Sequence, residues 1–169
     1  MSFASTALLP SSPLFPAEMS RLTIRAGAIL SAAPQTMKLL DFGYQGKSLD
    51  DLRRFLRENK VDVLVDVREN AVRVRKFKKT ALESLCRALG VTYIWARELG
   101  NPFRHENRWQ EAYEAYLNHS EAAKKRIEEL KRLLLGGKTL CLLCYERDST
   151  MCHRTILMRY LLQIDPFPF

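Results

Sequence analysis

The residues best suited to chemistry lie near the carboxyl end of the chain, on either side of one short loop. Cys144 is followed two positions later by Glu146, and Cys152, His153 and Arg154 are consecutive. A cysteine reacts as its thiolate, and a neighbouring histidine, a cation or a helix N-terminus lowers the pKa of a thiol. We therefore expect a thiol-dependent site in which Cys152, or alternatively Cys144, is the nucleophile. His153 would transfer protons, and Glu146 would orient the basic groups.

Two other interpretations of this cluster stay open. In the first, Cys152 is a small packed residue and Arg154 belongs to a structural ion pair. In the second, Cys144, Cys152 and His153 are three ligands of a zinc ion, a role for which cysteine and histidine are suited. The spacing of these residues matches no standard zinc motif, so we predict no cofactor and keep zinc as the alternative.

The elements that would position these side chains alternate between strands and helices after Met37. Apolar runs predict strands at residues 38–42, 61–67, 91–95 and 140–144. Amphipathic spacing predicts helices after Ser48 and Thr80, over residues 109–117 and 121–134, and from about Cys152 onward. This alternation indicates a three-layer α/β fold. Its four-stranded sheet would be mainly parallel with helices on both faces, rhodanese-like or Rossmann-like in outline.

Two of the predicted helix starts carry capping patterns. Ser48 precedes Asp51 by three residues, and Thr80 precedes Glu83 by the same spacing. In a capping box the hydroxyl accepts a backbone N–H of the first turn, and the acid three residues later accepts the N–H of the cap. We therefore expect Ser48 and Thr80 to be the N-cap residues of their helices.

The carboxyl ends of the predicted strands are the expected place for a ligand, since open parallel sheets bind ligands there. Chemistry-capable side chains follow every strand, namely Tyr44, Asp66, Arg68, Glu98 and Cys144. We expect these residues, with Arg154, to form an anion-binding pocket in which Arg68 and Arg154 clamp the ligand. Asp66 and Glu98 would orient the basic groups.

Arg154 stands in the first turn of the last predicted helix, where a positive charge is unfavourable for the helix itself. It should therefore have an anionic partner, and the candidates are Glu146, Asp66 and a bound ligand.

Cys141 lies three residues before Cys144 on the same predicted strand, so the two side chains should face opposite sides of the sheet. That placement argues against a Cys-x-x-Cys redox pair or zinc knuckle, and we expect Cys141 in the core. Trp109, Tyr113 and Tyr116 recur at helical spacing, which is typical of the buried face of a helix, so we expect them in the core. We expect His105 at the surface.

The chain is basic, with 27 Lys and Arg against 19 Asp and Glu, a net charge of +8 over 169 residues. The densest positive charge falls in residues 68–79, which suits contacts to a phosphate backbone. A non-catalytic nucleic-acid-binding module is therefore the alternative function, with the residues Arg73, Arg75, Lys76, Lys78 and Lys79. The competing interpretation is a solvent-exposed basic turn.

The first 36 residues are rich in serine, proline and alanine, and we expect them to be a mobile extension of a single domain over residues 37–169. Met19 or Met37 is a candidate alternative start. No apolar run is long enough to span a membrane. We interpret the four cysteines as free thiols of a reducing compartment and expect a cytoplasmic protein. The oligomeric state is not indicated.

The ordered motifs resemble the DUF488 family of uncharacterised proteins. The resemblance rests on Asp-Val-Arg at residues 66–68, Glu-Leu-Gly-Asn-Pro at 98–102, Cys-x-Glu at 144–146 and Cys-His-Arg at 152–154. It extends over residues 38–162 and implies a common site rather than a known reaction. The chain departs from the family pattern at residues 71–76, where many relatives have proline and serine and this segment is shorter and more basic.

Overall fold

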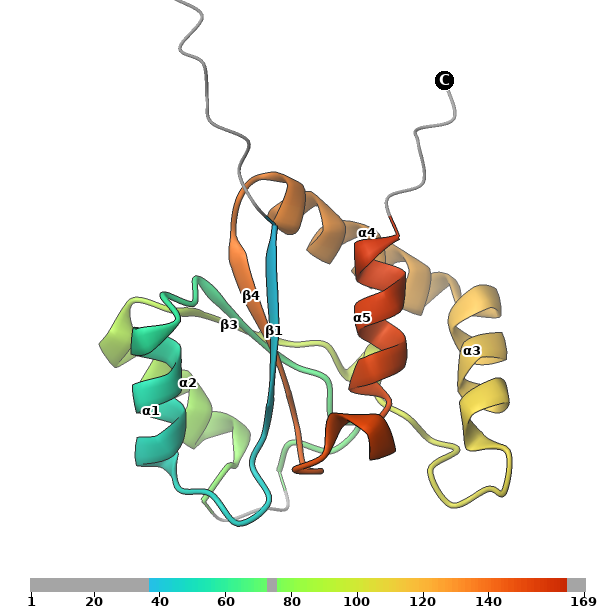
Figure 1. The fold of residues 1–169 in the computed structure, drawn as a ribbon, viewed down its shortest axis with the longest axis horizontal. Helices are drawn as coiled ribbons and strands as arrows, with labels where there is room; N and C mark the ends of the chain where they lie inside the picture. The colour runs from blue at the N-terminus through green and yellow to red at the C-terminus, as the bar shows by residue number, and fades with distance from the viewer. Residues whose placement is uncertain (1–36, 73–75, 164–169) are drawn as a thin grey trace, which may run out of the picture. The chain divides into compact units, whose positions relative to one another are not determined.

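A parallel sheet forms the centre of the protein, as Figure 1 shows for the computed structural model, which describes residues 37–72 and 76–163. The predicted extension over residues 1–36 lies outside the described residues, as do Arg73 and Arg75. The sheet has four strands, all parallel, in the order β1-β4-β2-β3. The strands are β1 (Lys38–Gly43), β2 (Val63–Asp66), β3 (Thr92–Trp95) and β4 (Thr139–Cys144).

Five α-helices of the described chain cover both faces of this sheet, which confirms the predicted three-layer α/β fold. They are α1 (Leu49–Glu58), α2 (Lys79–Leu89), α3 (Trp109–His119), α4 (Glu121–Leu135) and α5 (Arg154–Leu162). A short 3₁₀ turn, η1 (Arg97–Leu99), follows β3, and a second one, η2 (Ser149–Met151), precedes α5. The last helix therefore begins at Arg154, two residues after the predicted start at Cys152.

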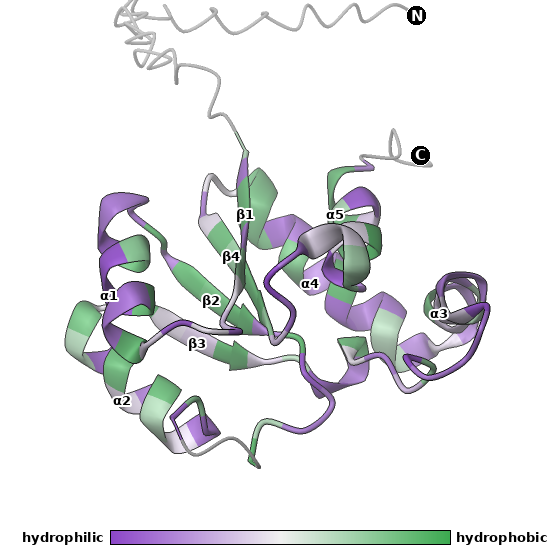
Figure 2. Cartoon of the chain, turned by 60° about the horizontal axis from the view of Figure 1, so that its bottom comes forward, coloured by the Kyte–Doolittle hydropathy of each residue, from purple (hydrophilic) through white to green (hydrophobic). Residues whose placement is uncertain are grey.

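Two hydrophobic cores hold the layers together, one on each face of the sheet (Figure 2). The apolar faces of α1 and α2 pack on one side through residues such as Leu52 and Leu82. The apolar faces of α3, α4 and α5 pack on the other side, where Tyr113, Leu130 and Leu157 are fully buried.

Strand β4 lies between β1 and β2. The alternation of its side chains places its two cysteines on opposite faces of the sheet. Cys144 belongs to the core beneath α3, α4 and α5, whereas Cys141 belongs to the core beneath α1 and α2. The prediction that these two cysteines face opposite sides of the sheet is confirmed. Cys141 is fully buried among apolar neighbours, as expected of a core residue.

The two predicted helix caps have different outcomes. Ser48 caps α1, with its Oγ accepting the Asp51 N–H and the Asp51 carboxylate accepting the Ser48 N–H, so this capping box is confirmed. Thr80 was expected to cap α2, and this prediction is wrong. The helix begins at Lys79 after Lys78, because the Lys79 N–H donates to the Ala71 carbonyl and fixes the chain before Thr80 is reached.

No helix among residues 37–72 and 76–163 has the length and apolar character required to cross a bilayer.

Candidate functional site

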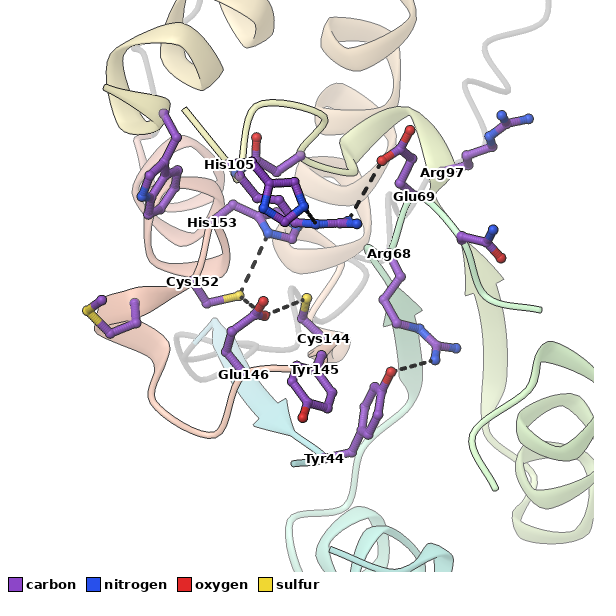
Figure 3. Close-up of a pocket in the computed structure, with 15 residues that line it drawn as sticks. Tyr44, Arg68, Glu69, Arg97, His105, Cys144, Tyr145, Glu146, Cys152 and His153 are labelled. Atoms are coloured by element: carbon purple, nitrogen blue, oxygen red, sulfur yellow. Dashed lines mark hydrogen bonds and ion pairs between the residues drawn. The ribbon is translucent and has the colours of Figure 1, made fainter. Parts of the chain in front are cut away.

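The carboxyl ends of the four strands border one cavity of about 760 Å³, drawn in Figure 3. Residues from each strand end contribute to its wall, in agreement with the rule for ligand sites in parallel sheets. The lining residues are Tyr44, Arg68, Glu69, Asn70, Arg97, Asn101, Arg104, His105, Trp109, Cys144, Tyr145, Glu146, Met151, Cys152 and His153.

Two thiols and a carboxylate meet in this cavity. Cys144 at the end of β4 and Cys152 just before α5 each place Sγ at 3.1 Å from Oε2 of Glu146. Both cysteines are almost fully buried, and neither forms a disulfide. The Glu146 oxygen therefore accepts from both thiols when these are protonated. The predicted association of Cys144, Glu146, Cys152 and His153 is present in the structure.

The orientation of His153 follows from the backbone around it. Its Nε2 lies 3.1 Å from the carbonyl oxygen of Val67, and its Nδ1 lies 3.7 Å from Cys152 Sγ. Because a carbonyl oxygen only accepts hydrogen bonds, Nε2 must carry the hydrogen. In the neutral ring, Nδ1 then holds a lone pair directed at the Cys152 thiol, which is the arrangement required of a proton acceptor.

The pKa values of the two thiols move in opposite directions. The neighbouring Cys144 thiol, together with His153 and the Arg154 backbone N–H, holds the pKa of Cys152 well below its usual range, although burial opposes this. The Cys152 contact, burial and Glu146 raise the pKa of Cys144. Two adjacent buried thiols can hold one negative charge more easily than two. Of the two thiols, Cys152 is therefore the one that loses its proton more readily.

Arg154 lies behind Cys152 and does not line the cavity. Its side chain is fully buried, with Nε donating to Cys152 Sγ at 3.3 Å and Nη2 donating to the Glu146 carbonyl at 2.5 Å. Its Nη1 lies 2.9 Å from Asp41 Oδ2, without the geometry of a hydrogen bond. The anionic partner is thus Asp41 on β1 rather than the Glu146 carboxylate, Asp66 or a ligand. Arg154 therefore contacts the Cys152 sulfur from within the protein.

Asp66 and Arg68 form a buried ion pair at the end of β2. Oδ1 of Asp66 accepts from Nε of Arg68 at 2.7 Å, and Oδ2 accepts from Nη2 at 2.5 Å. Nη2 also donates to the Phe77 carbonyl, and Nη1 donates to the Tyr44 hydroxyl at 3.1 Å. Burial opposes the charged form, yet Asp66 keeps the pKa of Arg68 above its ordinary value. Among the described residues these contacts use four of the five N–H groups, which leaves one Nη1 N–H of this cavity-lining arginine for a further partner.

Two further arginines, which the sequence analysis did not assign to the anion clamp, line the cavity. Arg97 in η1 and Arg104 in the loop before α3 both have exposed side chains. Arg97 forms no ion pair with any described residue, and Arg104 lies 4.0 Å from Glu69. Both belong to the polar stretch after β3. That position in the chain was the one feature of the sequence that could have indicated a place in the cavity wall. Which loop side chains turn inward depends on the path of the backbone.

Aromatic and histidine side chains of the same region are divided between core and cavity. Tyr113 and Tyr116 pack in or against the core and donate hydrogen bonds to the carbonyls of Leu99 and Glu98, as expected. Trp109 packs against the core as predicted, but it also lines the cavity. His105 is exposed, as predicted, and lines the cavity rim.

Glu98 does not reach the main cavity. Its carboxylate forms an ion pair with Nε of Arg126 in α4, and it lines a separate cavity of about 310 Å³. Tyr44 is buried, stacks on Phe77 and lines the main cavity. Among the predicted ligand-binding residues, Tyr44 and Arg68 therefore line the cavity, whereas Asp66, Glu98 and Arg154 lie outside its wall.

The basic segment is described only in part. Lys76 and Lys78 are exposed, whereas Lys79 is half-buried, with Nζ 5.0 Å from the centre of the Trp95 ring and 3.7 Å from a Glu83 carboxylate oxygen. None of the three lines the cavity. Their role in binding nucleic acid stays a prediction.

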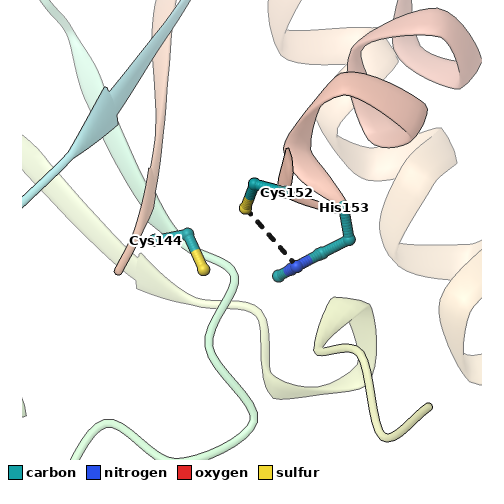
Figure 4. A group of neighbouring side chains, drawn as sticks. All are labelled: Cys144, Cys152 and His153. Carbon is teal, nitrogen blue, oxygen red and sulfur yellow. Dashed lines mark hydrogen bonds between the residues drawn. The ribbon is translucent and has the colours of Figure 1, made fainter. Parts of the chain in front are cut away.

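Cys144, Cys152 and His153 also form a group that is suited to a metal ion (Figure 4). Their sulfur and nitrogen donor atoms all lie within 4.8 Å of one another. The His153 N–H held by the Val67 carbonyl resembles the outer-shell hydrogen bond that usually orients a metal-bound histidine. These three residues could therefore hold a zinc ion.

The fold and site define a three-layer α/β protein with a thiol pair at the carboxyl edge of its sheet. The model of the family described as a domain of unknown function, DUF488, matches residues 48–161. Because this match covers more than half of the chain, the protein belongs to the DUF488 family, and the predicted resemblance is confirmed. Comparison with curated proteins and with solved structures found no match.

Proposed function

We propose that the cavity binds an anion and presents it to the Cys152 thiolate, with a phosphate- or nucleic-acid-derived compound as substrate. The observation that carries this proposal is the position of a thiol with a lowered pKa in the wall of a cavity that three arginines also line. An activated cysteine beside binding groups for an anion is the arrangement expected of a nucleophilic site.

Each group in the wall has a distinct role in this proposal. Cys152 attacks the electrophilic atom of the substrate and displaces its leaving group, and His153 Nδ1 accepts the thiol proton. Arg97 and Arg104, with the remaining N–H of Arg68, bind the anion. The clamp role that was expected of Arg154 passes to Arg97 and Arg104, because Arg154 is buried behind Cys152 and bonds to its sulfur.

Protection of Cys152 from alkylation tests the proposal. Iodoacetamide labelling at Cys152 should slow when inorganic pyrophosphate or a nucleoside monophosphate is added at constant ionic strength. Arg97→Gln and Arg104→Gln should each weaken this protection. Arg108→Gln is the control, because Arg108 carries the same charge on the same stretch of chain and does not line the cavity. Equal protection in all three variants would contradict the anion-binding role.

A zinc site is a second candidate, favoured by the closeness of Cys144, Cys152 and His153. Their donor atoms all lie within 4.8 Å of one another. Cysteine sulfur and histidine nitrogen are usual ligands of zinc in proteins. Stoichiometric zinc in protein purified without added metal, lost in Cys144→Ser, would support this candidate. Metal-free protein with an alkylatable Cys152 would remove it.

Nucleic-acid binding by the basic segment is the third candidate, and the exposure of Lys76 and Lys78 favours it. Its affinity should fall steeply with salt and should survive Cys152→Ser, because phosphate contacts release counterions and need no thiol. Affinity that is independent of salt would contradict this candidate.

A further inference from the structure

We propose that Cys144 and Cys152 act as a thiol–disulfide exchange pair whose substrate is a small disulfide carrying carboxylate groups. This inference extends the proposed anion pocket to a second class of anion and to a named chemistry. It rests on that pocket for its choice of substrate, but the exchange itself rests on the two thiols.

The first argument is the proximity of the thiols. Each Sγ lies 3.1 Å from the same Glu146 oxygen, and the two Sγ atoms are within 4.8 Å of each other. A disulfide requires an S–S distance of about 2.05 Å, so its formation requires the two side chains to rotate away from the carboxylate and toward each other. Cys86 and Cys141 belong to the core on the opposite face of the sheet, so neither competes for this pairing.

The second argument is the difference between the surroundings of the two thiols. Cys152 Sγ lies 3.7 Å from His153 Nδ1, which can accept the thiol proton, and it accepts the Arg154 Nε–H, which favours the charged sulfur. Among the described residues, the Cys144 thiol donates to Glu146, and both Cys152 Sγ and a His153 ring nitrogen lie within 4.8 Å of it. Cys152 is therefore the attacking thiol, and Cys144 is the resolving thiol whose proton goes to the Glu146 carboxylate.

The third argument concerns the charge of the substrate. Arg68, Arg97 and Arg104 line the cavity wall, against the carboxylates of Glu69 and Glu146. Positive charge at the mouth of a site increases the rate at which anions associate with it and decreases the rate for cations. A cavity of about 760 Å³ also has the size of a site for a small organic molecule rather than for a single ion.

The reaction balances without any further reagent. The Cys152 thiolate attacks one sulfur of the small disulfide R–S–S–R, forms a mixed disulfide and releases one thiolate R–S⁻. Cys144 then attacks the Cys152 sulfur, which forms the Cys144–Cys152 disulfide and releases the second R–S⁻. The protein loses two electrons, the small disulfide gains them, and the protons of the two protein thiols end on the two released thiols.

The test compares oxidised glutathione, which is anionic, with cystamine, which is cationic, on the full chain. Peptide mass spectrometry after acid quenching follows each cysteine with time. We expect a Cys144–Cys152 disulfide that forms several times faster with oxidised glutathione, and a glutathione adduct that persists on Cys152 in Cys144→Ser. Arg104→Gln should reduce the preference for the anionic reagent, whereas Arg108→Gln should leave it unchanged.

The outcomes separate this inference from the proposed function. Absence of a Cys144–Cys152 disulfide with both reagents would overturn the exchange pair, even if pyrophosphate still protects Cys152 from alkylation. Formation of the disulfide at equal rates with both reagents would overturn the assignment of an anionic substrate. An adduct that accumulates on Cys144 in Cys152→Ser as fast as on Cys152 in Cys144→Ser would overturn the order of attack.

Discussion

Gly43 and Glu146 approach so closely that no side chain fits between them. A Cβ atom at Gly43 would lie 1.8 Å from the Glu146 carbonyl oxygen, which also accepts the Nη2–H of Arg154. The end of β1 therefore holds the backbone of the residue whose carboxylate contacts both thiols. Glycine at position 43 is therefore required for the position of Glu146 in the site as well as for the end of the strand.

Gly43→Ala should displace the Glu146 backbone and separate its carboxylate from the thiols. Overpacking of this kind costs about 1–3 kcal/mol of folding free energy, which urea denaturation would measure. Alkylation at Cys152 should also change its pH dependence. Gly46→Ala is the control, because Gly46 has a positive φ of 74° but no atom within 4 Å of its added Cβ. It should lose about 1–2 kcal/mol and keep the thiol chemistry. Unchanged Cys152 reactivity in Gly43→Ala would contradict the account.

The parts of the fold that follow from local patterns could be predicted from the sequence. Period-two alternation along a strand assigned Cys141 and Cys144 to opposite faces, and the Ser48 cap depends only on neighbours within one turn. Thr80 has an equally good local pattern, but a hydrogen bond from Lys79 to Ala71, eight positions earlier in the chain, decides where α2 begins. A pattern within one turn contains no information about such a contact.

The parts of the site that were not predicted from the sequence depend on the order of the strands and on the path of the loops. Asp41 became the partner of Arg154 because β1 lies next to β4, and the sequence does not give that order. Arg97 and Arg104 line the cavity because of the course of the loop after β3. The residues adjacent to strand ends, such as Tyr44 and Cys144, were found because a parallel sheet alone brings them to one edge.

Asp66→Asn should strongly destabilise the protein, because Arg68 would remain buried without its counter-charge. Removing one partner of a buried ion pair costs about 3–5 kcal/mol. Tyr93→Phe is the matched control, since it removes only the hydroxyl that donates to Asp66 Oδ2 at 2.8 Å. It should cost about 1–2 kcal/mol. Urea midpoints measure both effects, and equal losses would show that the ion pair does not stabilise the end of β2.

Stability should fall at alkaline pH because of the buried thiol of Cys86. Burial raises the pKa of Cys86 to about 12, whereas an unfolded thiol ionises near about 8.5. Between about pH 8.5 and pH 12, the folded state therefore keeps a proton on Cys86 that the unfolded state has lost. The stabilisation that Cys86 contributes is fully present below about pH 8.5 and is lost as the pH rises, by up to about 1.4 kcal/mol per pH unit. Cys86→Ala should be less stable at neutral pH but should show a shallower alkaline slope. An identical slope would contradict the prediction.

The pH dependence of alkylation at each cysteine tests the central claim most directly. Iodoacetamide labelling of the full chain, mapped by peptide mass spectrometry, gives one titration curve per thiol. The account predicts a Cys152 midpoint well below the ordinary value of about 8.5, with Cys86 and Cys141 unreactive throughout the neutral range. A Cys152 midpoint at or above about 8.5, in metal-free folded protein, would contradict an activated thiol in this cavity.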